Sequence, residues 1–328
     1  MLILTGTAPI NGFGNTLDNT ITGNDADNSL FAGIGNDSLY GGGGNDILYG
    51  EIGNDILYGG GGNDYLDGQD GDDAMNGGNG DDLYFVNSTG DTVTEESVTG
   101  GYDTVNSSVT FALGPNLEVL ILTGAAPISG HGNSLNNAIT GNGVDNFLHG
   151  WDGDDTLYGG GGDDSPFGPI GNDSLDGGTG NDFLRGDTGD DILNGGANDD
   201  MLYGGMGNDT LTGGDNADKF VFDTPLGPAN VDVITDFYWA EGDKIYLDRD
   251  IFTVLGSYTG TLSDANFWKS NSGMPVGSDD YFLYYTDSNS LYYDQDGSGG
   301  AYAPVKFATV NFHVSEDNLY AEDFTIIA

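Results

Sequence analysis

Residues 41–67 read GGGGNDILY, GEIGNDILY and GGGGNDYLD, three nonapeptides that follow one another without a gap. Each unit has glycine at its first and fourth positions, aspartate at its sixth and leucine at its eighth. The first six residues favour turns and the last three favour a strand. Because each strand is followed by a loop that reverses the chain, two nonapeptides make one turn of a flattened all-β coil, with the eighth residue facing inward.

The composition excludes several functions. The chain has 328 residues, with 6 Lys and Arg against 53 Asp and Glu, a net charge of −47. Nucleic acids and anionic membrane surfaces would repel such a chain, and no apolar run is long enough to span a membrane. Self-repulsion opposes a compact state unless counter-cations bind. The aspartates are periodic, which favours bound divalent cations over a halophilic or disordered acidic chain.

The repeat extends far beyond its central units. Residues 2–84 recur at 120–202 without an insertion. We therefore expect a first β-roll block at 1–85, a linker of strands at 86–131 that adds rungs to the same sheets, a second block at 132–222 and an aromatic-rich antiparallel β domain at 223–328. The first copy starts part-way through the repeating unit, so we expect a fragment or a longer array; a short gene with an uncapped first rung is the alternative.

The sixth-position aspartates are the predicted calcium ligands. Calcium takes six to eight oxygens in a forgiving geometry, whereas magnesium demands a stricter octahedron and zinc prefers nitrogen or sulfur. The chain has no cysteine and only 3 His. The predicted carboxylate ligands are Asp37, Asp46, Asp55, Asp64, Asp73, Asp82, Asp155, Asp164, Asp173, Asp182, Asp191, Asp200, Asp209 and Asp218. Glycines reach positive φ at no steric cost, and the predicted carbonyl ligands are Gly41, Gly43, Gly59, Gly61, Gly159, Gly161 and Gly177.

Loops 18 residues apart should stack on the same edge of the coil. Stacked carboxylates repel one another unless a cation lies between them, so Asp46 and Asp64 should share one ion. One ion between each such pair of loops gives about ten Ca²⁺ in total, on this ligand logic. We expect weaker sites where the pattern is broken, at Asn19, Asn28, Pro166, Pro169, Asn198 and Asn216.

The repeat resembles that of the RTX family, secreted bacterial proteins with GGxGxDxUx units that include adhesins, toxins and the C-terminal parts of serralysin-like proteases and some lipases. The resemblance implies a right-handed parallel β-roll that folds on extracellular calcium. It also implies export by type I secretion machinery, directed by an uncleaved C-terminal signal. Residues 213–223 (GGDNADKFVFD) and 232–248 look like a serralysin-type C-terminal module, and the terminal AEDFTIIA is similar to that family's signals.

Other residues carry weaker hypotheses. His131 and His149 are 18 apart and could face one another, but we expect solvated surface histidines rather than a metal pair. Ninth-position tyrosines such as Tyr40 and Tyr58 should point outward and stack between rungs; glycan contact is the alternative. Residues 294–299 (DQDGSG) resemble the start of a calcium loop, although a hairpin turn is the simpler interpretation.

The chain has no HExxH, GxSxG or P-loop motif, so we expect that it is not an enzyme. The leading hypothesis is an extracellular calcium-binding protein that serves as a structural, adhesive or assembly module. Its candidate partners are calcium ions, the secretion machinery, a cell-surface glycan and other copies of itself. The second hypothesis is the secretion and folding module of a larger extracellular protease or lipase. A third gives residues 223–328 a catalytic or sugar-binding role.

Overall fold

The computed structural model describes residues 1–95, 101–271, 279–297, 302–314 and 318–328. Its regular structure is almost entirely β, with short 3-10 turns at Thr253–Leu255, Asp264–Asn266 and Ala321–Asp323. The prediction of an all-β protein is confirmed. Within the described ranges, no helix has the length and apolarity needed to cross a membrane. The chain divides into two compact units, Met1–Thr156 and Leu157–Ala328.

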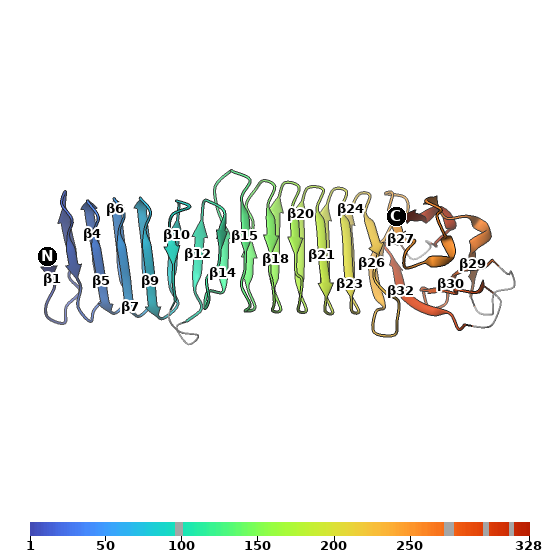
Figure 1. Cartoon of the computed structure of the whole chain (residues 1–328), viewed down its shortest axis with the longest axis horizontal. Coiled ribbons are helices and arrows are strands. Elements are labelled where there is room, and N and C mark those ends of the chain that lie inside the picture. The colour runs from blue at the N-terminus through green and yellow to red at the C-terminus, as the bar shows by residue number, and fades with distance from the viewer. Residues whose placement is uncertain (96–100, 272–278, 298–301, 315–317) are drawn as a thin grey trace. The chain divides into compact units, whose positions relative to one another are not determined.

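The first unit is a parallel β-roll in which successive strands alternate between sheets (Figure 1). One sheet has the order β1-β3-β5-β7-β9-β11 and consists of Leu2–Ile3, Thr20–Thr22, Ser38–Gly43, Ile56–Gly61, Ala74–Asn79 and Thr92–Val93. The even-numbered strands β2 to β16 pair in the same way and consist of Gly12–Asn15, Ser29–Ile34, Ile47–Ile52, Tyr65–Asp70, Leu83–Val86, Thr104–Ser107, Val119–Leu122 and Ala138–Thr140. Phe111–Ala112, Ser129–His131 and Phe147–His149 are β13, β15 and β17, also parallel.

The register confirms the predicted 18-residue turn. Leu39 of β5 pairs with Leu57 of β7, and Leu30 of β4 pairs with Leu48 of β6. The eighth-position side chains face inward as predicted, because each removes an apolar side chain from water at no polar cost. Those with exposed fractions of 0–1% are Leu39, Leu48, Leu57, Leu66, Met75, Leu157, Leu175, Leu184, Leu193, Leu202, Leu211 and Phe220.

The strands are longer than the three residues that the sequence pattern indicates. β5 covers Ser38–Gly43, so the first three glycines of the next nonapeptide continue the strand. Leu39 and Gly41 are both buried along this strand, which places the first-position glycine on the inward face. The connecting loop therefore has only three residues, Gly44, Asn45 and Asp46, and it ends on the aspartate.

The described part of the segment between the two repeat blocks also forms parallel strands. β12 pairs in parallel with β10 on one side and β14 on the other, so the segment between the repeat blocks adds rungs to the same sheet. In the same way, β11 pairs in parallel with β9, and β13 pairs in parallel with β15.

The second unit is also a parallel β-roll, and its strand pairing changes toward the end of the chain. β18 is Thr156–Gly161, and the parallel strands β19 to β27 are Ser165–Phe167, Ser174–Thr179, Phe183–Thr188, Ile192–Ala197, Met201–Met206, Thr210–Asp215, Lys219–Phe222, Asp232–Phe237 and Lys244–Asp248. β19 has three residues where regular rungs have six, and its buried Pro166 faces inward as predicted.

The C-terminal residues form an antiparallel region only in part. β30 (Phe282–Tyr285), β31 (Ser290–Tyr293) and β32 (Val305–Phe312) are antiparallel neighbours, and β28 (Gly260–Thr261) pairs antiparallel with β33 (Phe324–Ile327). However, β32 also pairs in parallel with β26, β33 pairs in parallel with β27, and β29 (Phe267–Ser270) pairs in parallel with β30. The last strands of the chain therefore also extend both sheets of the roll.

Candidate metal centre

The predicted aspartate ligands form buried rows at the loop ends. Every sixth-position aspartate named above is 0–2% exposed, although each carries a carboxylate. Burying an ionised carboxylate is costly unless it is paired or binds a metal. Each buried carboxylate therefore needs hydrogen bonds or a positive charge nearby. The contacts of its two oxygens show which of these the chain provides.

One oxygen of each carboxylate is held by the backbone of the neighbouring turn. The Asp46 amide donates to Oδ1 of Asp64 at 2.7 Å, and the Asp37 amide donates to Oδ1 of Asp55 at 2.7 Å. Residues 18 apart are thus direct neighbours, as predicted. The sequence does not reveal this bond, because the repeat pattern shows only that carboxylates stack and repel one another unless a cation binds.

The surroundings of the second oxygen differ from those of the first. Oδ2 is buried and lacks a hydrogen-bond partner among the described residues in Asp37, Asp46, Asp55, Asp64, Asp73, Asp82, Asp182, Asp191, Asp200, Asp209 and Asp218. A buried, unsatisfied carboxylate oxygen in a repeated position indicates a missing ligand. Calcium fits this donor, because it binds hard oxygen ligands and neutralises the carboxylate charge.

The first-position glycines create room beside this oxygen. A Cβ atom built on Gly41 would lie 2.2 Å from Oδ2 of Asp46 and 2.5 Å from the carbonyl oxygen of Gly59. A Cβ on Gly159 would likewise lie 2.5 Å from Oδ2 of Asp164 and 2.5 Å from the carbonyl oxygen of Gly177. Only glycine leaves this space open, so a carboxylate oxygen and a carbonyl oxygen of the next turn border one small volume.

The third-position glycines lie elsewhere. Gly43, Gly61 and Gly161 are the last residues of β5, β7 and β18. A Cβ on Gly61 would meet nothing within 4 Å. Their predicted role as carbonyl ligands stays a prediction, whereas the first-position glycines border the carboxylates directly.

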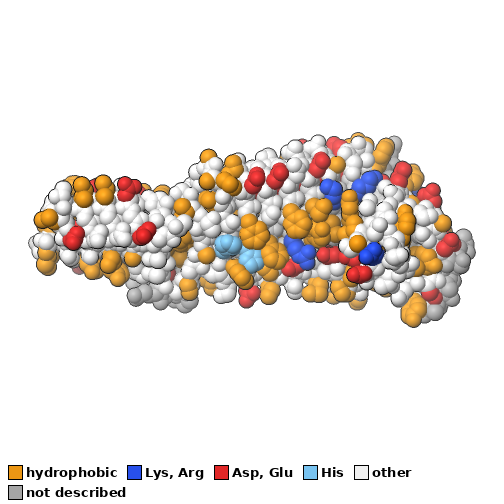
Figure 2. Space-filling model, turned by 45° about the horizontal axis from the view of Figure 1, so that its top comes forward, with side chains coloured by type: hydrophobic (Ala, Val, Ile, Leu, Met, Phe, Trp, Pro, Cys, Tyr) orange, Lys and Arg blue, Asp and Glu red, His pale blue; other side chains and the backbone are white. Residues whose placement is uncertain are grey.

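Burial raises the pKa values of these aspartates from the ordinary value of 3.8. The pKa of Asp46 rises to about 6, that of Asp64 to about 7 and that of Asp191 to about 8, with desolvation the largest cause and neighbouring carboxylates adding to it. The six basic residues of the chain are Arg185, Lys219, Lys244, Arg249, Lys269 and Lys306. On the face shown in Figure 2, Lys and Arg side chains accordingly lie over the second unit. The first unit contains none, so its rows must draw their counter-charge from solution.

Asparagine at the sixth position removes the need for an ion. Oδ1 of Asn28 accepts from the Asn24 amide at 2.8 Å, and its Nδ2 donates to the carbonyl oxygen of Ile10 at 2.9 Å. Asn137 repeats this arrangement with the Asn133 amide at 2.7 Å. The neutral side chain supplies both an acceptor and a donor, which is a physical reason to expect poorer metal sites at these rungs.

The carboxylate rows continue beyond the repeat motif. The Asp73 amide donates to Oδ1 of Asp91 at 3.0 Å, and the Asp218 amide donates to Oδ1 of Asp243 at 3.0 Å. The residues in these rows that lie outside the glycine-rich nonapeptides are Asp91, Asp103, Glu118, Asp232 and Asp243. Asp91 still keeps the nine-residue phase of Asp82, whereas Asp103, Asp232 and Asp243 do not. The four aspartates share a signal that could have found them, an aspartate two residues before an inward apolar residue, as in Asp103-Thr104-Val105.

The prediction of a solvated surface histidine was wrong for His149. His149 is 9% exposed, and its ring lies edge-on to Trp151 with centroids 4.1 Å apart. Its centroid is 6.2 Å from that of His131, which pairs with it in the register of β15 and β17. Burial lowers the pKa of both rings. The aromatic neighbours, which sequence spacing does not show, withdraw these side chains from solvent.

The tyrosine prediction is confirmed where the rungs are regular. Tyr40 and Tyr58 are 40% and 41% exposed, and their rings stack with centroids 5.2 Å apart. The Asp294–Asp296 stretch lies between antiparallel β31 and β32, with the Asp296 amide donating to Oδ1 of Asp294 at 3.2 Å. This agrees with a turn, although residues 298 and 299 lie outside the described ranges.

Comparison with known proteins matches the repeat blocks. The family model of the RTX calcium-binding nonapeptide repeat (4 copies) matches residues 13–48, 49–84, 131–166, 168–202 and 185–220. Among solved structures, the extracellular lipase LipA from Serratia marcescens is similar at 14% identity and a TM-score of 0.18, over 71% of this chain and 46% of that chain. The chain thus spans less than half of that lipase chain. No curated protein matches it.

Proposed function

Because the chain is an RTX repeat protein with calcium-binding nonapeptides in both glycine-rich blocks, we propose that it is a secreted structural, adhesive or assembly module that folds on binding extracellular calcium. One observation carries this proposal. Among the described residues, a buried oxygen without a hydrogen-bond partner recurs at sixth-position aspartates such as Asp46, Asp64 and Asp191. Such an oxygen is tolerable in a folded chain only if it is protonated or binds a cation.

The chain would prepare each site through its backbone. The amide of one turn fixes Oδ1 of the next, as in the pair of Asp37 and Asp55. The inward glycine keeps the space beside Oδ2 open. Bound calcium would supply the positive charge that the first unit lacks and would be held by Oδ2 with neighbouring carbonyl oxygens. Because each pair of ligands belongs to two turns, binding and stacking are coupled.

A calcium titration tests this proposal. We expect a largely disordered chain in EGTA at about pH 8, where the buried carboxylates are ionised, and a β-rich circular dichroism spectrum as calcium is added, with magnesium at equal concentration much less effective because it dehydrates reluctantly. A complete β spectrum in excess EGTA would contradict the proposal.

We also propose that the chain is not catalytic. Its closely spaced carboxylates are the usual candidates for acid–base chemistry, but in the repeat rows they are buried and tied to backbone amides. Assays of the calcium-loaded protein against ester and peptide substrates should therefore show no turnover. Measurable hydrolysis that is lost with a substitution in residues 223–328 would favour the enzymatic alternative.

A further inference from the structure

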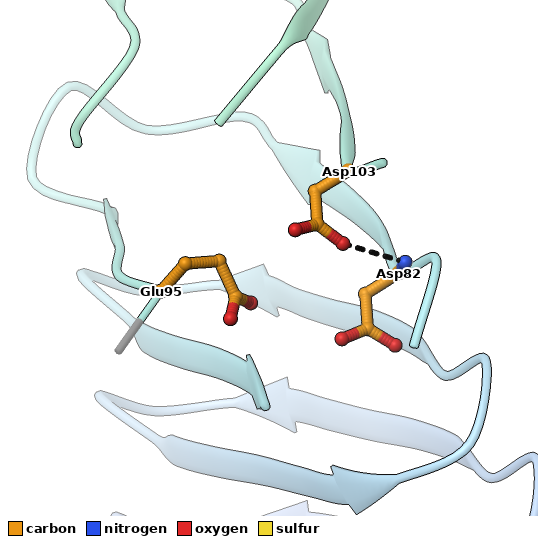
Figure 3. A group of neighbouring side chains, drawn as sticks. All are labelled: Asp82, Glu95 and Asp103. Carbon is orange, nitrogen blue, oxygen red and sulfur yellow. Dashed lines mark hydrogen bonds between the residues drawn. The ribbon is translucent and has the colours of Figure 1, made fainter. Parts of the chain in front are cut away.

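Three buried carboxylates meet where the first repeat block ends (Figure 3). Asp82, Glu95 and Asp103 each offer an oxygen within 4.8 Å of the others. Their exposed fractions are 2%, 7% and 1%. Glu95 and Asp103 lie outside the nonapeptide pattern, so the repeat motif does not assign this cluster.

Glu95 stands where a regular turn would have its first-position glycine. Inside the block, the residue 18 positions after Gly41 is Gly59, whose carbonyl oxygen borders the small volume beside Oδ2 of Asp46. The residue 18 positions after Gly77 is Glu95. Its Oε1 accepts from the Gly77 amide at 3.1 Å and its two oxygens accept from the Gly78 amide at 3.3 Å. A side-chain carboxylate thus occupies the register that a glycine fills elsewhere.

Asp82 aims an unsatisfied oxygen at this group. Its Oδ1 accepts from the Asp64 amide at 2.7 Å, whereas its buried Oδ2 has no hydrogen-bond partner among the described residues. A Cβ on Gly77 would lie 2.0 Å from this Oδ2 and 2.4 Å from the hydroxyl oxygen of Tyr84. That hydroxyl donates a hydrogen bond to Oε1 of Glu95. The unpartnered oxygen therefore lies on the side of the cluster that Tyr84 and Glu95 border.

The chain supplies no positive charge for these groups. The first unit contains no Lys or Arg. Burial, followed by neighbouring carboxylates, raises the pKa of Asp82 to about 8 and that of Asp103 to about 7. Three carboxylates at this separation are mutually unfavourable in their charged forms unless a cation lies among them.

We propose that Asp82, Glu95 and Asp103 hold a divalent cation that closes the first repeat block. The oxygen-only donor set favours calcium. This site differs from the repeat sites because a side-chain carboxylate replaces the first-position glycine of the next turn. More ligand charge gives tighter calcium binding, so this ion is the last to leave the first unit when calcium is withdrawn. The proposal rests on calcium binding by the repeats and adds a site to it.

Glu95→Gln tests the site in the full chain. It removes the charge but keeps an acceptor for the Gly77 amide. Equilibrium dialysis against ⁴⁵Ca²⁺ should show one ion fewer per chain, with the wild-type circular dichroism at saturating calcium. Glu51→Gln is the matched control, since Glu51 is a half-buried glutamate of the same block, and it should bind the wild-type number. An unchanged ion number and affinity in Glu95→Gln would overturn the inference.

Two further outcomes are decisive. If Glu95→Gln does not fold in saturating calcium, Glu95→Asp decides: folding with the wild-type ion number supports a ligand whose charge is needed, and failure to fold overturns the inference. If the wild type itself binds no calcium, the proposed function fails together with this site. If it binds calcium and Glu95→Gln matches it, only this site fails.

Discussion

The backbone amide of Asp46 donates a 2.7 Å hydrogen bond to Oδ1 of Asp64, the aspartate one full turn of the roll further along. Oδ2 of the same carboxylate has no hydrogen-bond partner in the part of the chain that the structure describes. The two oxygens of one side chain thus have different roles. Oδ1 accepts the hydrogen bond that joins neighbouring loops, and Oδ2 remains available to a cation. A substitution can therefore remove the cation ligand and keep the hydrogen bond between the loops.

Asp64→Asn should weaken calcium binding without preventing the fold. The amide oxygen can still accept from Asp46, but the charge that attracts the ion is gone. We expect the calcium midpoint of folding to rise by about tenfold, the scale on which changes around a metal site alter affinity. Circular dichroism during a calcium titration measures the midpoint. Asp25→Asn removes an equal charge from an exposed position and should leave the midpoint nearly unchanged. Equal shifts in both variants would mean that net charge alone sets the calcium dependence.

Much of this architecture was predictable from the sequence, because period and chemistry coincide in the repeat. The spacing of Leu39 and Leu57 predicted the 18-residue turn, and that of Asp46 and Asp64 predicted which loops stack. Two features were not predictable from the period. The backbone bond to Oδ1 depends on where the loop ends in space, and rows that continue to Asp103 and Asp243 cross insertions that break the nine-residue phase.

The reverse substitution, Asn28→Asp, should make an ion-independent rung depend on calcium. Nδ2 of Asn28 now donates to the carbonyl oxygen of Ile10 at 2.9 Å, and a carboxylate oxygen there would face that carbonyl without a proton. At the lowest calcium concentration that folds the wild type, the variant should exchange its amide hydrogens faster than the wild type over residues 10–34, as read by hydrogen-exchange mass spectrometry. At saturating calcium the difference should shrink. A wild-type exchange pattern in both conditions would show that the asparagine is not a substitute for an ion.

Without calcium, acid should favour the folded state. Burial raises the pKa of Asp73 to about 7 and that of Asp218 to about 8, above the ordinary value of 3.8. A group whose pKa is higher in the folded state stabilises that state fully below its unfolded pKa, and the contribution is lost as pH rises through the folded pKa. In calcium-free buffer we therefore expect β structure to be greatest near pH 4 and to disappear between about pH 6 and 8. Calcium affinity should rise over the same interval, because protons and the cation compete for Oδ2.

Circular dichroism across this pH range distinguishes the titration of the buried aspartates from the titration of exposed carboxylates. Exposed carboxylates titrate near pH 4, so simple relief of self-repulsion would place the midpoint there. A midpoint near 4, or a spectrum that does not change with pH, would contradict the role of the buried aspartates.

Leu57→Ala should destabilise the calcium-loaded roll. Leu57 is 0% exposed and pairs with Leu39 on one side and Met75 on the other, so truncation leaves a cavity between three stacked rungs. Such a change costs about 2–5 kcal/mol. Urea denaturation at saturating calcium measures it. Ile56→Ala is the matched control, because Ile56 is the adjacent residue of β7 and 41% exposed. Surface substitutions usually change stability by about 0.5 kcal/mol or less. A control variant as unstable as Leu57→Ala would show that the inward leucines do not form the core.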